Sequence, residues 1–422
     1  MGAVKMKLAI NGGERSAAKL GGMIPPWPVA DEEAKRSVLE VLEGNDWCRI
    51  YEYSRVRKFE IAFADYHDAS HAIAVANGTV ALELALLASG VKAGDEVLVP
   101  ALTFIASASA IACVGAVPIF VDSDPETLSI SPKDAEAKIT DKTRAIIGVH
   151  YAGYPIDFDA IKPLAKRNGL ILIEDCAHAH GTEWKGRKVG AIGDMGGFSF
   201  QASKSLAAGE GGVVLTDDDK MAERAELIHN IGRVVGKPGY LHYVLSSNYR
   251  MTEMQGALLL SLMRHLPWQT EYKHEVGAYL AERLRRIGGV EPLKSDERIT
   301  KRGYYFFVIK YDASEFGGID RDTFLRALGA EGVPCGKAYG VPLYRNEAFL
   351  PENLALVGTL AGQKLPDYSK VRLPVVEKFC AEQQVTIPHT VLLAGRKGAD
   401  MIADAIAKIK ENADELRTKA GP

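Results

Sequence analysis

Short apolar runs alternate with longer amphipathic stretches between residues 31 and 265 of this chain. Most of the runs are apolar at every position, and many of their residues are Val or Ile. Strands with this pattern are usually buried on both faces, as in a parallel sheet that helices cover on either side. We therefore predict an α/β fold with a mostly parallel central sheet, whose strands lie at residues 72–75, 96–99, 117–121, 145–149, 170–174, 197–200 and 212–215.

The stretches between these runs have the periodicity of amphipathic helices, most clearly at residues 79–88, 104–114 and 158–168. After residue 251 the pattern changes. A strongly apolar helix is expected over 251–263, and a second long helix ends near residue 287. Beyond it the pattern predicts a strand and two amphipathic helices, at 304–311, 321–329 and 399–413.

These changes divide the chain into three parts. Glycine pairs and the run Pro25-Pro26-Trp27-Pro28 interrupt regular structure near the N-terminus. We therefore expect an N-terminal arm, a large domain and a smaller C-terminal α/β domain, at residues 1–30, 31–269 and 270–422. A chain of 422 residues is long enough to form two such cores.

Composition and charge exclude several classes of protein. Hydrophobic residues make up 47% and charged residues 25% of the chain, which is typical of a soluble globular protein. A net charge of −3 predicts no nucleic-acid partner, and residues 6–10 are too short an apolar run for a signal peptide or a membrane anchor. The five cysteines are dispersed and odd in number, so we expect no disulfide framework, no zinc site and a cytoplasmic location.

One lysine and one aspartate stand where pyridoxal 5'-phosphate (PLP) chemistry would need them. Asp175 follows the apolar run 170–174, and Lys204 follows the run 197–200. A lysine amine can form a Schiff base with the aldehyde of this cofactor, and a carboxylate can keep its pyridine nitrogen protonated. Glycines at 209, 211 and 212 imply a tight turn just after the lysine.

Residues at the ends of other strands are candidates for a cofactor cradle. Gly78 and Thr79 lie between a predicted strand and a helix, where glycine allows close approach and free amides suit a phosphate. Taken alone, Thr79 is more simply a helix N-cap. Ser199 is a second phosphate candidate, or else a strand hydroxyl bonded to the backbone. Phe104 is a candidate for stacking on a flat cofactor, although a core position is the simpler interpretation of one Phe.

The segment after Asp175 contains Cys176, His178 and His180, each two residues from the next. This spacing fits no standard structural zinc site, so we predict no metal there. A structural hydrogen bond is the simpler role for one histidine, and His178 is also a candidate for contact with the cofactor ring or its phenolic oxygen. Asn248 precedes the apolar helix and is most simply part of a polar loop that caps it.

Taken together, these motifs resemble the DegT/DnrJ/EryC1/StrS family of PLP-dependent aminotransferases, which have the type I fold. The resemblance extends from about residue 30 to the C-terminus. Each motif is weak alone, whereas the set in this order is specific. The motifs are Asn-Gly-Thr at 77–79, Pro-x-x-Thr-Phe at 100–104, Glu-Asp-Cys-Ala-His-Ala-His-Gly at 174–181, Phe-Ser-Phe-x-x-x-Lys at 198–204, Gly-Glu-Gly-Gly at 209–212 and Asn-Tyr-Arg-Met at 248–251.

The resemblance implies a role for each matching residue. Lys204 and Asp175 would be catalytic, through the Schiff base and the pyridine nitrogen. The phosphate would be bound by Gly78, Thr79 and Ser199, and Phe104 would stack on the face of the ring. His178 would contact the ring oxygen, at a position where many members have Gln. Asn248 would reach the phosphate in the neighbouring subunit, which implies a homodimer with shared active sites.

Two further segments resemble the cyclitol branch of that family, which includes glutamine:scyllo-inosose aminotransferases and 3-amino-5-hydroxybenzoate synthases. They are residues 8–13 and 340–344, whereas residues 44–51 depart from a Gly-rich stretch that many sugar members carry. The resemblance implies a two-stage, ping-pong transfer of an amino group from glutamine or glutamate to a keto-cyclitol or keto-sugar. Tyr339, Arg250 and His150 are candidates for substrate contact.

The sequence leaves other functions open. An aminodehydratase that makes an aminobenzoate would share Lys204, whereas a sugar dehydratase of the same family would have His there. A non-enzymatic PLP-binding regulator would need a DNA-binding module or a basic patch, and the sequence has neither. A nicotinamide oxidoreductase is disfavoured because no Gly-x-Gly-x-x-Gly motif follows the first predicted strand.

Overall fold

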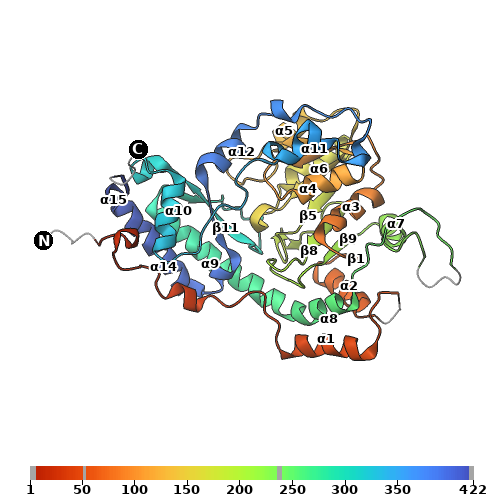
Figure 1. Ribbon diagram of the computed structural model, residues 1–422, viewed down its shortest axis with the longest axis horizontal. Coiled ribbons are helices and arrows are strands. Elements are labelled where there is room, and N and C mark those ends of the chain that lie inside the picture. The colour runs from red at the N-terminus through yellow and green to blue at the C-terminus, as the bar shows by residue number, and fades with distance from the viewer. Residues whose placement is uncertain (1–5, 51–53, 235–239, 418–422) are drawn as a thin grey trace.

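The computed structural model describes residues 6–50, 54–234 and 240–417, so Tyr51, at the end of the divergent segment 44–51, lies outside the described residues. A central sheet of seven strands has the order β1-β9-β8-β5-β4-β2-β3 (Figure 1). Its strand β9 is antiparallel to both neighbours, and the other pairs are parallel. The strands are β1 (His71–Val75), β2 (Glu96–Pro100), β3 (Val117–Val121), β4 (Thr143–Val149), β5 (Ile171–Asp175), β8 (Met195–Ser199) and β9 (Gly212–Thr216).

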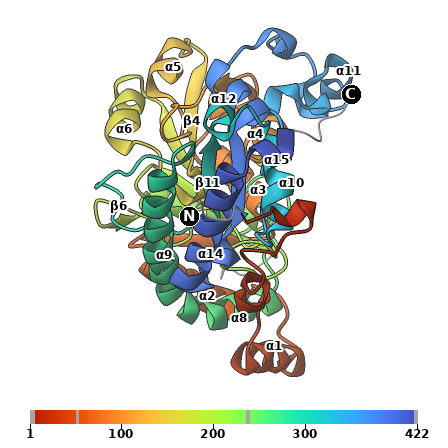
Figure 2. The ribbon, with the colours of Figure 1, turned by 90° about the vertical axis from the view of Figure 1, so that its left-hand side faces the viewer.

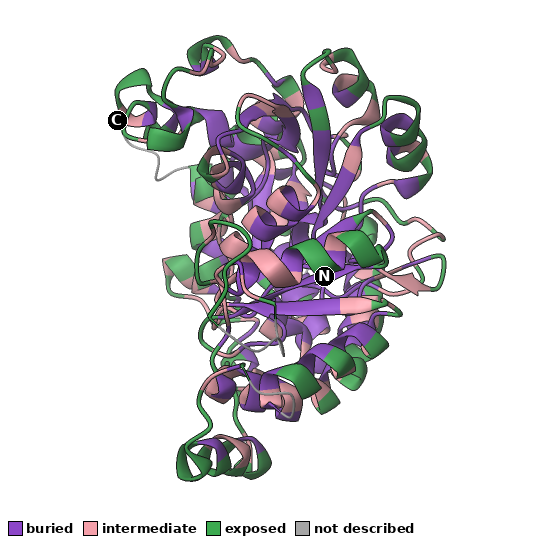
Figure 3. Ribbon diagram, turned by 90° about the vertical axis from the view of Figure 1, so that its right-hand side faces the viewer, coloured by how far each residue is buried: buried purple, intermediate pink, exposed green. Residues whose placement is uncertain are grey.

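Both faces of this sheet are covered, which explains why its strands are apolar throughout. In β2, Val97 and Val99 belong to one core cluster, whereas Leu98 between them belongs to the other. The burial colouring of Figure 3 shows these strands as buried ribbons inside a shell of exposed helix faces. The predicted α/β architecture is confirmed. The covering helices are α2 (Arg55–Tyr66), α3 (Gly78–Ala88), α4 (Ala106–Cys113), α5 (Pro132–Ala137), α6 (Phe158–Arg167) and α7 (Asp219–His229).

A second, antiparallel sheet consists of β10 (Val290–Pro292), β11 (Phe306–Tyr311) and β12 (Gln384–Pro388). It shares a core with α9 (Leu266–Ile287), α10 (Arg321–Ala330) and α14 (Gly395–Glu411), in which Leu280, Phe307 and Ile406 are buried. The chain between β11 and β12 returns to the large sheet, where Tyr368 packs on Phe120 at a ring distance of 5.5 Å. The boundary proposed at residue 270 lies within α9, and the division into domains stays a prediction.

The N-terminal arm crosses the smaller core before it reaches the large one. Leu8 and Leu20 are buried in the core of the second sheet. The arm then passes α14 and continues to α1 (Glu32–Gly44), which packs on α8 (Glu253–Leu262) (Figure 2). Among the described residues, no helix is both long and apolar enough to span a membrane. The short elements are β6 (Glu183–Trp184), β7 (Arg187–Lys188), α11 (Pro351–Leu354), α12 (Pro374–Lys378), α13 (His389–Leu392) and α15 (Asp414–Arg417).

Candidate active site

The predicted site residues gather at one edge of the large sheet. Strands β2, β4, β5 and β8 run parallel, so their carboxyl ends meet at the same edge. Strand β1 has the same direction, because β9 is antiparallel both to it and to β8. Asp175 ends β5, Ser199 ends β8, and Gly78 begins the helix that follows β1. Ligands of α/β proteins usually bind at this edge, which makes it the candidate active site.

Lys204 lies on the loop between β8 and β9 and is 9% exposed. Its ammonium nitrogen lies 4.2 Å from the ring centroid of Tyr305. Burial lowers the pKa of Lys204 to about 8, and the negative charge of Asp175 acts in the opposite direction. At pH 7 about a tenth of a lysine with this pKa is neutral, far more than of an ordinary lysine, and the neutral form is the one that a nucleophile or general base requires. Tyr305 was not among the residues predicted for the site.

Asp175 is held by two donors. Its Oδ2 accepts a hydrogen bond of 2.6 Å from the hydroxyl of Ser107, and its Oδ1 accepts one of 3.1 Å from the amide of Ala177. The hydroxyl of Thr103 lies 2.9 Å from that of Ser107 and extends the network. No ion pair within the described ranges includes Asp175, so its charge is available to a cationic ligand group. The i,i+4 pair of hydroxyls after β2 was the only sequence signal for Ser107.

Gly78 and Ser199 are brought into direct contact. A Cβ atom on Gly78 would lie 2.5 Å from Cβ of Ser199 and 3.0 Å from its hydroxyl, so only glycine fits. The N-cap of α3 is Asn77, whose side chain accepts from the amide of Val80 at 3.1 Å, and not Thr79. The first amides of α3 and the hydroxyl of Ser199 thus lie at one contact, and donors of these kinds suit a phosphate.

A second glycine closes this cradle from the other side. A Cβ atom on Gly212 would lie 2.4 Å from the carbonyl oxygen of Asn77. The turn that follows Lys204 therefore packs on the residue that caps α3. This contact connects the lysine loop directly to the phosphate candidate.

His178 forms one wall of the site with two tyrosines. Its ring stacks on Tyr305 at 4.2 Å, and its Nε2 lies 3.2 Å from the hydroxyl of Tyr339. Burial is the main reason why the pKa of His178 lies well below its usual range, and the positive charge of Lys204 lowers it further. Its Nδ1 accepts from the amide of Ala152 at 3.4 Å, so a neutral His178 carries its proton on Nε2.

Phe104 and Tyr339 both lie at this wall. The two rings are 6.5 Å apart, and Phe104 is 55% exposed, which is unusual for a large apolar side chain. The core position considered for Phe104 is therefore wrong. It precedes α4, because the predicted helix 104–114 begins only at Ala106.

The structure changes the interpretation of His150. This residue is completely buried, its Nε2 donates to Glu174 at 2.9 Å, and its Nδ1 accepts from the amide of Ile156 at 3.1 Å. Both nitrogens therefore have protein partners, and we no longer propose a substrate contact for His150. Its role is to hold Glu174, which also accepts from backbone amides of the loop before β8.

Two other predicted residues lie in the loop before α8, whose backbone pairs with the end of β1 at Val75. Arg250 donates to the side chain of Asn230 at 3.0 Å, and Asn248 is exposed. The backbone of Asn248 pairs with that of Asn230. Within one subunit the structure assigns neither side chain a contact with Lys204, Asp175 or Ser199. The role proposed for Asn248 needs a second subunit, and the substrate contact proposed for Arg250 stays a prediction.

The histidines and cysteine considered as metal ligands have other contacts. His180 donates to the carbonyl oxygen of Ser199 at 2.9 Å, which is the structural role expected for one histidine of this segment. Cys176 lies near His150 and Glu174, and these three form a buried cluster of potential ligand atoms. The Glu174 carboxylate already accepts from His150 and from three backbone amides, so its oxygens are occupied by protein donors.

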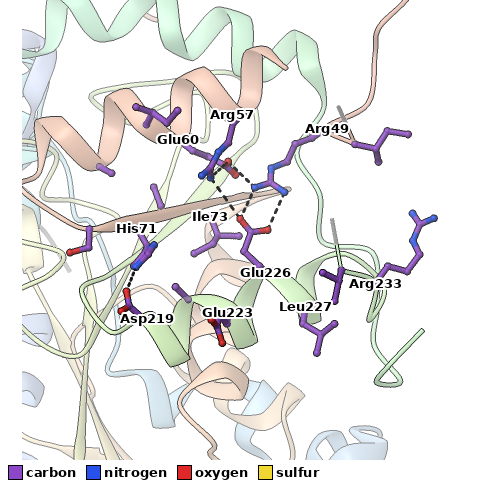
Figure 4. Close-up of a pocket in the computed structure, with 17 residues that line it drawn as sticks. Arg49, Arg57, Glu60, His71, Ile73, Asp219, Glu223, Glu226, Leu227 and Arg233 are labelled. Carbon is purple, nitrogen blue, oxygen red and sulfur yellow. Dashed lines mark hydrogen bonds and ion pairs between the residues drawn. The ribbon is translucent and has the colours of Figure 1, made fainter. Parts of the chain in front are cut away.

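A separate cavity of about 1020 Å³ lies between α2, β1 and α7 (Figure 4). At its wall, Arg49 and Arg57 point toward Glu60 and Glu226, and Arg49 pairs with both carboxylates at 2.7 and 2.9 Å. Burial is the largest influence on the pKa of Arg49, but the two carboxylates outweigh it and raise that pKa above its usual value. The charges at this wall thus compensate one another, and none of the residues around Lys204 lines the cavity.

Comparisons with known proteins decide the family. The model of the DegT/DnrJ/EryC1/StrS aminotransferase family matches residues 28–392. The chain belongs to this family. It is therefore an aminotransferase, and the family resemblance drawn from the motifs is confirmed.

Members of the DegT/DnrJ/EryC1/StrS family with assigned reactions are similar over nearly the whole chain. An L-glutamine:2-deoxy-scyllo-inosose aminotransferase of Streptoalloteichus tenebrarius is 37% identical over 97% of this chain and 99% of its own length. An L-glutamine:scyllo-inosose aminotransferase of Streptomyces griseus is also 37% identical, over the same shares. The crystal structure of 3-amino-5-hydroxybenzoic acid synthase is 34% identical, covers 92% of this chain and 98% of that chain, and has a TM-score of 0.82.

Proposed function

We propose that this aminotransferase binds PLP at Lys204 and moves an amino group from glutamine or glutamate to a keto-cyclitol. The observation that carries the proposal is the placement of Lys204, Asp175 and the Gly78–Ser199 contact at one sheet edge. A buried amine, an unpaired carboxylate and a phosphate cradle are the three groups that this cofactor needs.

The residues fit the cofactor chemically. Lys204 is buried with its pKa lowered to about 8, which suits reaction with an aldehyde. The Asp175 carboxylate accepts two hydrogen bonds and forms no ion pair with any described residue, which leaves its charge for a pyridinium nitrogen. Gly78, Thr79 and Ser199 would hold the phosphate, Phe104 would cover one face of the ring, and His178 would contact its phenolic oxygen.

When bound, PLP supplies an electron sink that accepts the electron pair released at the α-carbon of the amino donor. The neutral amine of Lys204 would take the proton from the α-carbon of the donor as general base and would deliver it, as general acid, to the former aldehyde carbon of the cofactor. Asp175 stabilises positive charge at the ring nitrogen, and Ser107 orients its carboxylate. The aromatic wall of Tyr305, Tyr339 and His178 excludes water from one side of Lys204.

A keto-cyclitol is favoured as acceptor because relatives named for scyllo-inosose substrates align over almost the full length. Tyr339 supports this choice, since its hydroxyl, which lies 3.2 Å from Nε2 of His178, offers a hydrogen bond rather than a charge to an uncharged polyol. The regulator and the nicotinamide oxidoreductase are not favoured by these relatives. An aminodehydratase is the second candidate, because 3-amino-5-hydroxybenzoic acid synthase has a similar structure.

Two half-reactions test the proposal. The purified protein, loaded with PLP, is titrated with glutamine, glutamate and alanine while the absorption band of the lysine-bound cofactor is followed. We expect glutamine or glutamate to bleach the band and alanine to have little effect. The band should then return with scyllo-inosose or 2-deoxy-scyllo-inosose, but not with a nucleotide-linked keto-sugar.

The outcomes separate the candidates. No bleaching with any donor would contradict transamination. Release of water together with an aromatic product would indicate the aminodehydratase. Borohydride reduction followed by peptide mass spectrometry should place the cofactor on Lys204, with Lys204→Arg as the unlabelled control.

A homodimer with shared active sites is supported by the exposed apolar residues near Asn248. Leu245 is fully exposed, and Tyr240, Leu241 and Tyr243 are exposed beside it. Ile50 and Ile61, at the wall of the cavity in Figure 4, are exposed as well. Surfaces of this kind usually mark an interface.

All five cysteines are free thiols, which supports a cytoplasmic location.

Subunit complementation tests the shared site. The variants Lys204→Ala and Asn248→Ala are mixed, dissociated and reassociated. In a shared arrangement, each heterodimer contains one intact site, with Lys204 from one subunit and Asn248 from the other. We expect activity to return in the mixture. Activity equal to the mean of the two separate variants would contradict shared sites.

A further inference from the structure

Three consecutive residues of the lysine loop are held by side chains from three distant segments. The indole N–H of Trp27 donates to the carbonyl oxygen of Lys204 at 3.0 Å. The Nε2 of His389 lies 3.2 Å from the carbonyl oxygen of Ser203 and donates to it, since a carbonyl only accepts. Lys273 donates to the hydroxyl of Ser205 at 2.9 Å. We call Trp27, Lys273 and His389 the lysine clamp.

Trp27 reaches Lys204 from an arm that is anchored on both sides. Upstream, Leu20 is buried in the smaller core, and the amide of Ala17 donates to the carbonyl of Glu331 at 2.9 Å. Downstream, Asp31 pairs with His265 at 2.8 Å, at the junction of α8 and α9. The arm runs from the smaller core to α1 (Figure 2), and between its two anchors the indole of Trp27 reaches the lysine loop.

The second member, Lys273, is completely buried on α9 without any carboxylate among its described partners. Its ammonium donates only to the Ser205 hydroxyl and to the carbonyl of Tyr304, at 2.9 and 3.0 Å. Burial of an amine among neutral acceptors is unfavourable compared with an apolar side chain of the same size. Lys273 bonds to Ser205, the residue after Lys204. The cost of burying the amine therefore arises beside Lys204, which points to a role beyond packing.

The clamp also reaches the Lys204 side chain. The Trp27 ring meets His389 edge to face at 5.0 Å, and the ring of His389 lies 6.1 Å from that of Tyr305 at an interplanar angle of 25°. Tyr305 in turn carries the Lys204 ammonium on its face at 4.2 Å. Its hydroxyl lies 2.8 Å from that of Ser203. Trp27 and His389 thus hold the backbone of the loop and, through Tyr305, the surface beneath the amine, whereas Lys273 holds the loop at the Ser205 hydroxyl.

We propose that Trp27, Lys273 and His389 are positioning residues that fix Lys204 for reaction, and that the N-terminal arm thereby couples the smaller core to the catalytic amine. This inference rests on the role proposed above for Lys204. The clamp touches neither the amine nor any predicted phosphate contact. Its loss should change how fast Lys204 reacts more than how tightly substrates bind.

Trp27→Phe tests the clamp, because it removes the N–H but keeps an aromatic ring beside His389. The matched control is Trp268→Phe, an exposed tryptophan that lines one cavity together with Trp27 and whose N–H, among the described residues, contacts only His265. Loss of one hydrogen bond corresponds to a factor of about five to ten. We therefore expect Trp27→Phe to lower the rate of cofactor attachment to Lys204 and kcat by about that factor, with KM changed less than about twofold.

A second measurement needs no cofactor. Hydrogen exchange of the cofactor-free protein should be about fivefold to tenfold faster across residues 202–208 in Trp27→Phe, and unchanged in Trp268→Phe. If Trp27→Phe does not fold, as judged by circular dichroism, Lys273→Met takes its place with the same expectations. Exchange and attachment rates equal to those of the unmodified protein would overturn the clamp.

The two proposals fail separately. If borohydride attaches the cofactor to another residue in the unmodified protein, the proposed function of Lys204 is contradicted, whereas the exchange experiment still decides on the clamp. If Lys204 is labelled but Trp27→Phe and Lys273→Met behave like Trp268→Phe, the proposed function stands and the clamp is overturned.

Discussion

Ser107 donates a hydrogen bond of 2.6 Å to Asp175, so a helix that follows β2 holds the carboxylate at the end of β5. The two residues are 68 positions apart and meet because the carboxyl ends of parallel strands share one edge of the sheet. A carboxylate that must face a cationic ring nitrogen needs a fixed direction as well as a charge, and the Ser107 hydroxyl supplies that direction.

Ser107→Ala should weaken cofactor binding. A hydrogen bond to a buried charged group contributes about 1.5–3 kcal/mol, so the Kd for PLP should rise about tenfold to a hundredfold. Fluorescence titration of the cofactor-free protein measures this change. Ser109→Ala, on the same helix, is the control, because its hydroxyl contacts only the Ala106 carbonyl at 3.4 Å. Equal affinity in the two variants would show that Ser107 does not orient Asp175.

Gly78→Ala should disrupt the phosphate cradle. The new Cβ would lie 2.5 Å from Cβ of Ser199, and such overpacking costs about 1–3 kcal/mol. We expect lower stability in urea and little PLP or inorganic phosphate bound. Gly329→Ala is the control in α10, where nothing lies within 4 Å of the new atom. This control should gain about 0.5–1 kcal/mol, so a gain in Gly78→Ala would contradict the close contact.

The Lys204 amine should react at unusually low pH. Burial lowers its pKa to about 8 from 10.5, so the neutral, reactive form is already present above pH 8. In the cofactor-free protein, trinitrobenzenesulfonate should therefore label Lys204 with a midpoint near pH 8, read by peptide mass spectrometry. Because Asp175 raises this pKa, Asp175→Asn should move the midpoint to lower pH. Asp404→Asn on the surface of α14 should leave it unchanged, and a midpoint above pH 10 would contradict the burial of the amine.

Lys273 should make the stability of the protein depend on pH. Burial lowers its folded-state pKa to about 7 from 10.5, so between these values the unfolded chain binds a proton that the folded protein lacks. The free energy of unfolding therefore rises with pH in this window, by about 1.4 kcal/mol per pH unit from this one group. Below pH 7 both states carry the proton and the dependence from this group ends.

Urea unfolding at pH 7, 8 and 9 checks this prediction by comparing the unmodified protein with Lys273→Met. As the pH rises, the free energy of unfolding of the unmodified protein should increase relative to that of Lys273→Met. Lys220→Met, at an exposed lysine of α7, supplies the baseline. A constant difference across the three pH values would mean that Lys273 does not titrate in this range.

Much of the fold could be predicted because its signals are local. The run 96–99 is apolar throughout, and β2 is indeed buried on both faces. Glycine signals at Gly78 and at 209–212 marked positions where a distant segment approaches the backbone closely, namely Ser199 at Gly78 and the Asn77 carbonyl at Gly212. The element ends were less accurate: helix 104–114 begins only at Ala106, since Thr103 and Phe104 take part in the turn that leads to Ser107.

By itself, the sequence determined the layers of the fold, the family and the residues that stand at strand ends, because apolar periodicity and short motifs are read along the chain. Only the tertiary structure decided which side chains meet. It buried His150 against Glu174, placed Tyr305 beneath Lys204, and brought Trp27 to a carbonyl 177 positions away. Such contacts depend on the order of the strands in the sheet and on the path of the arm in space. Neither of these can be inferred from the spacing of neighbouring residues along the chain.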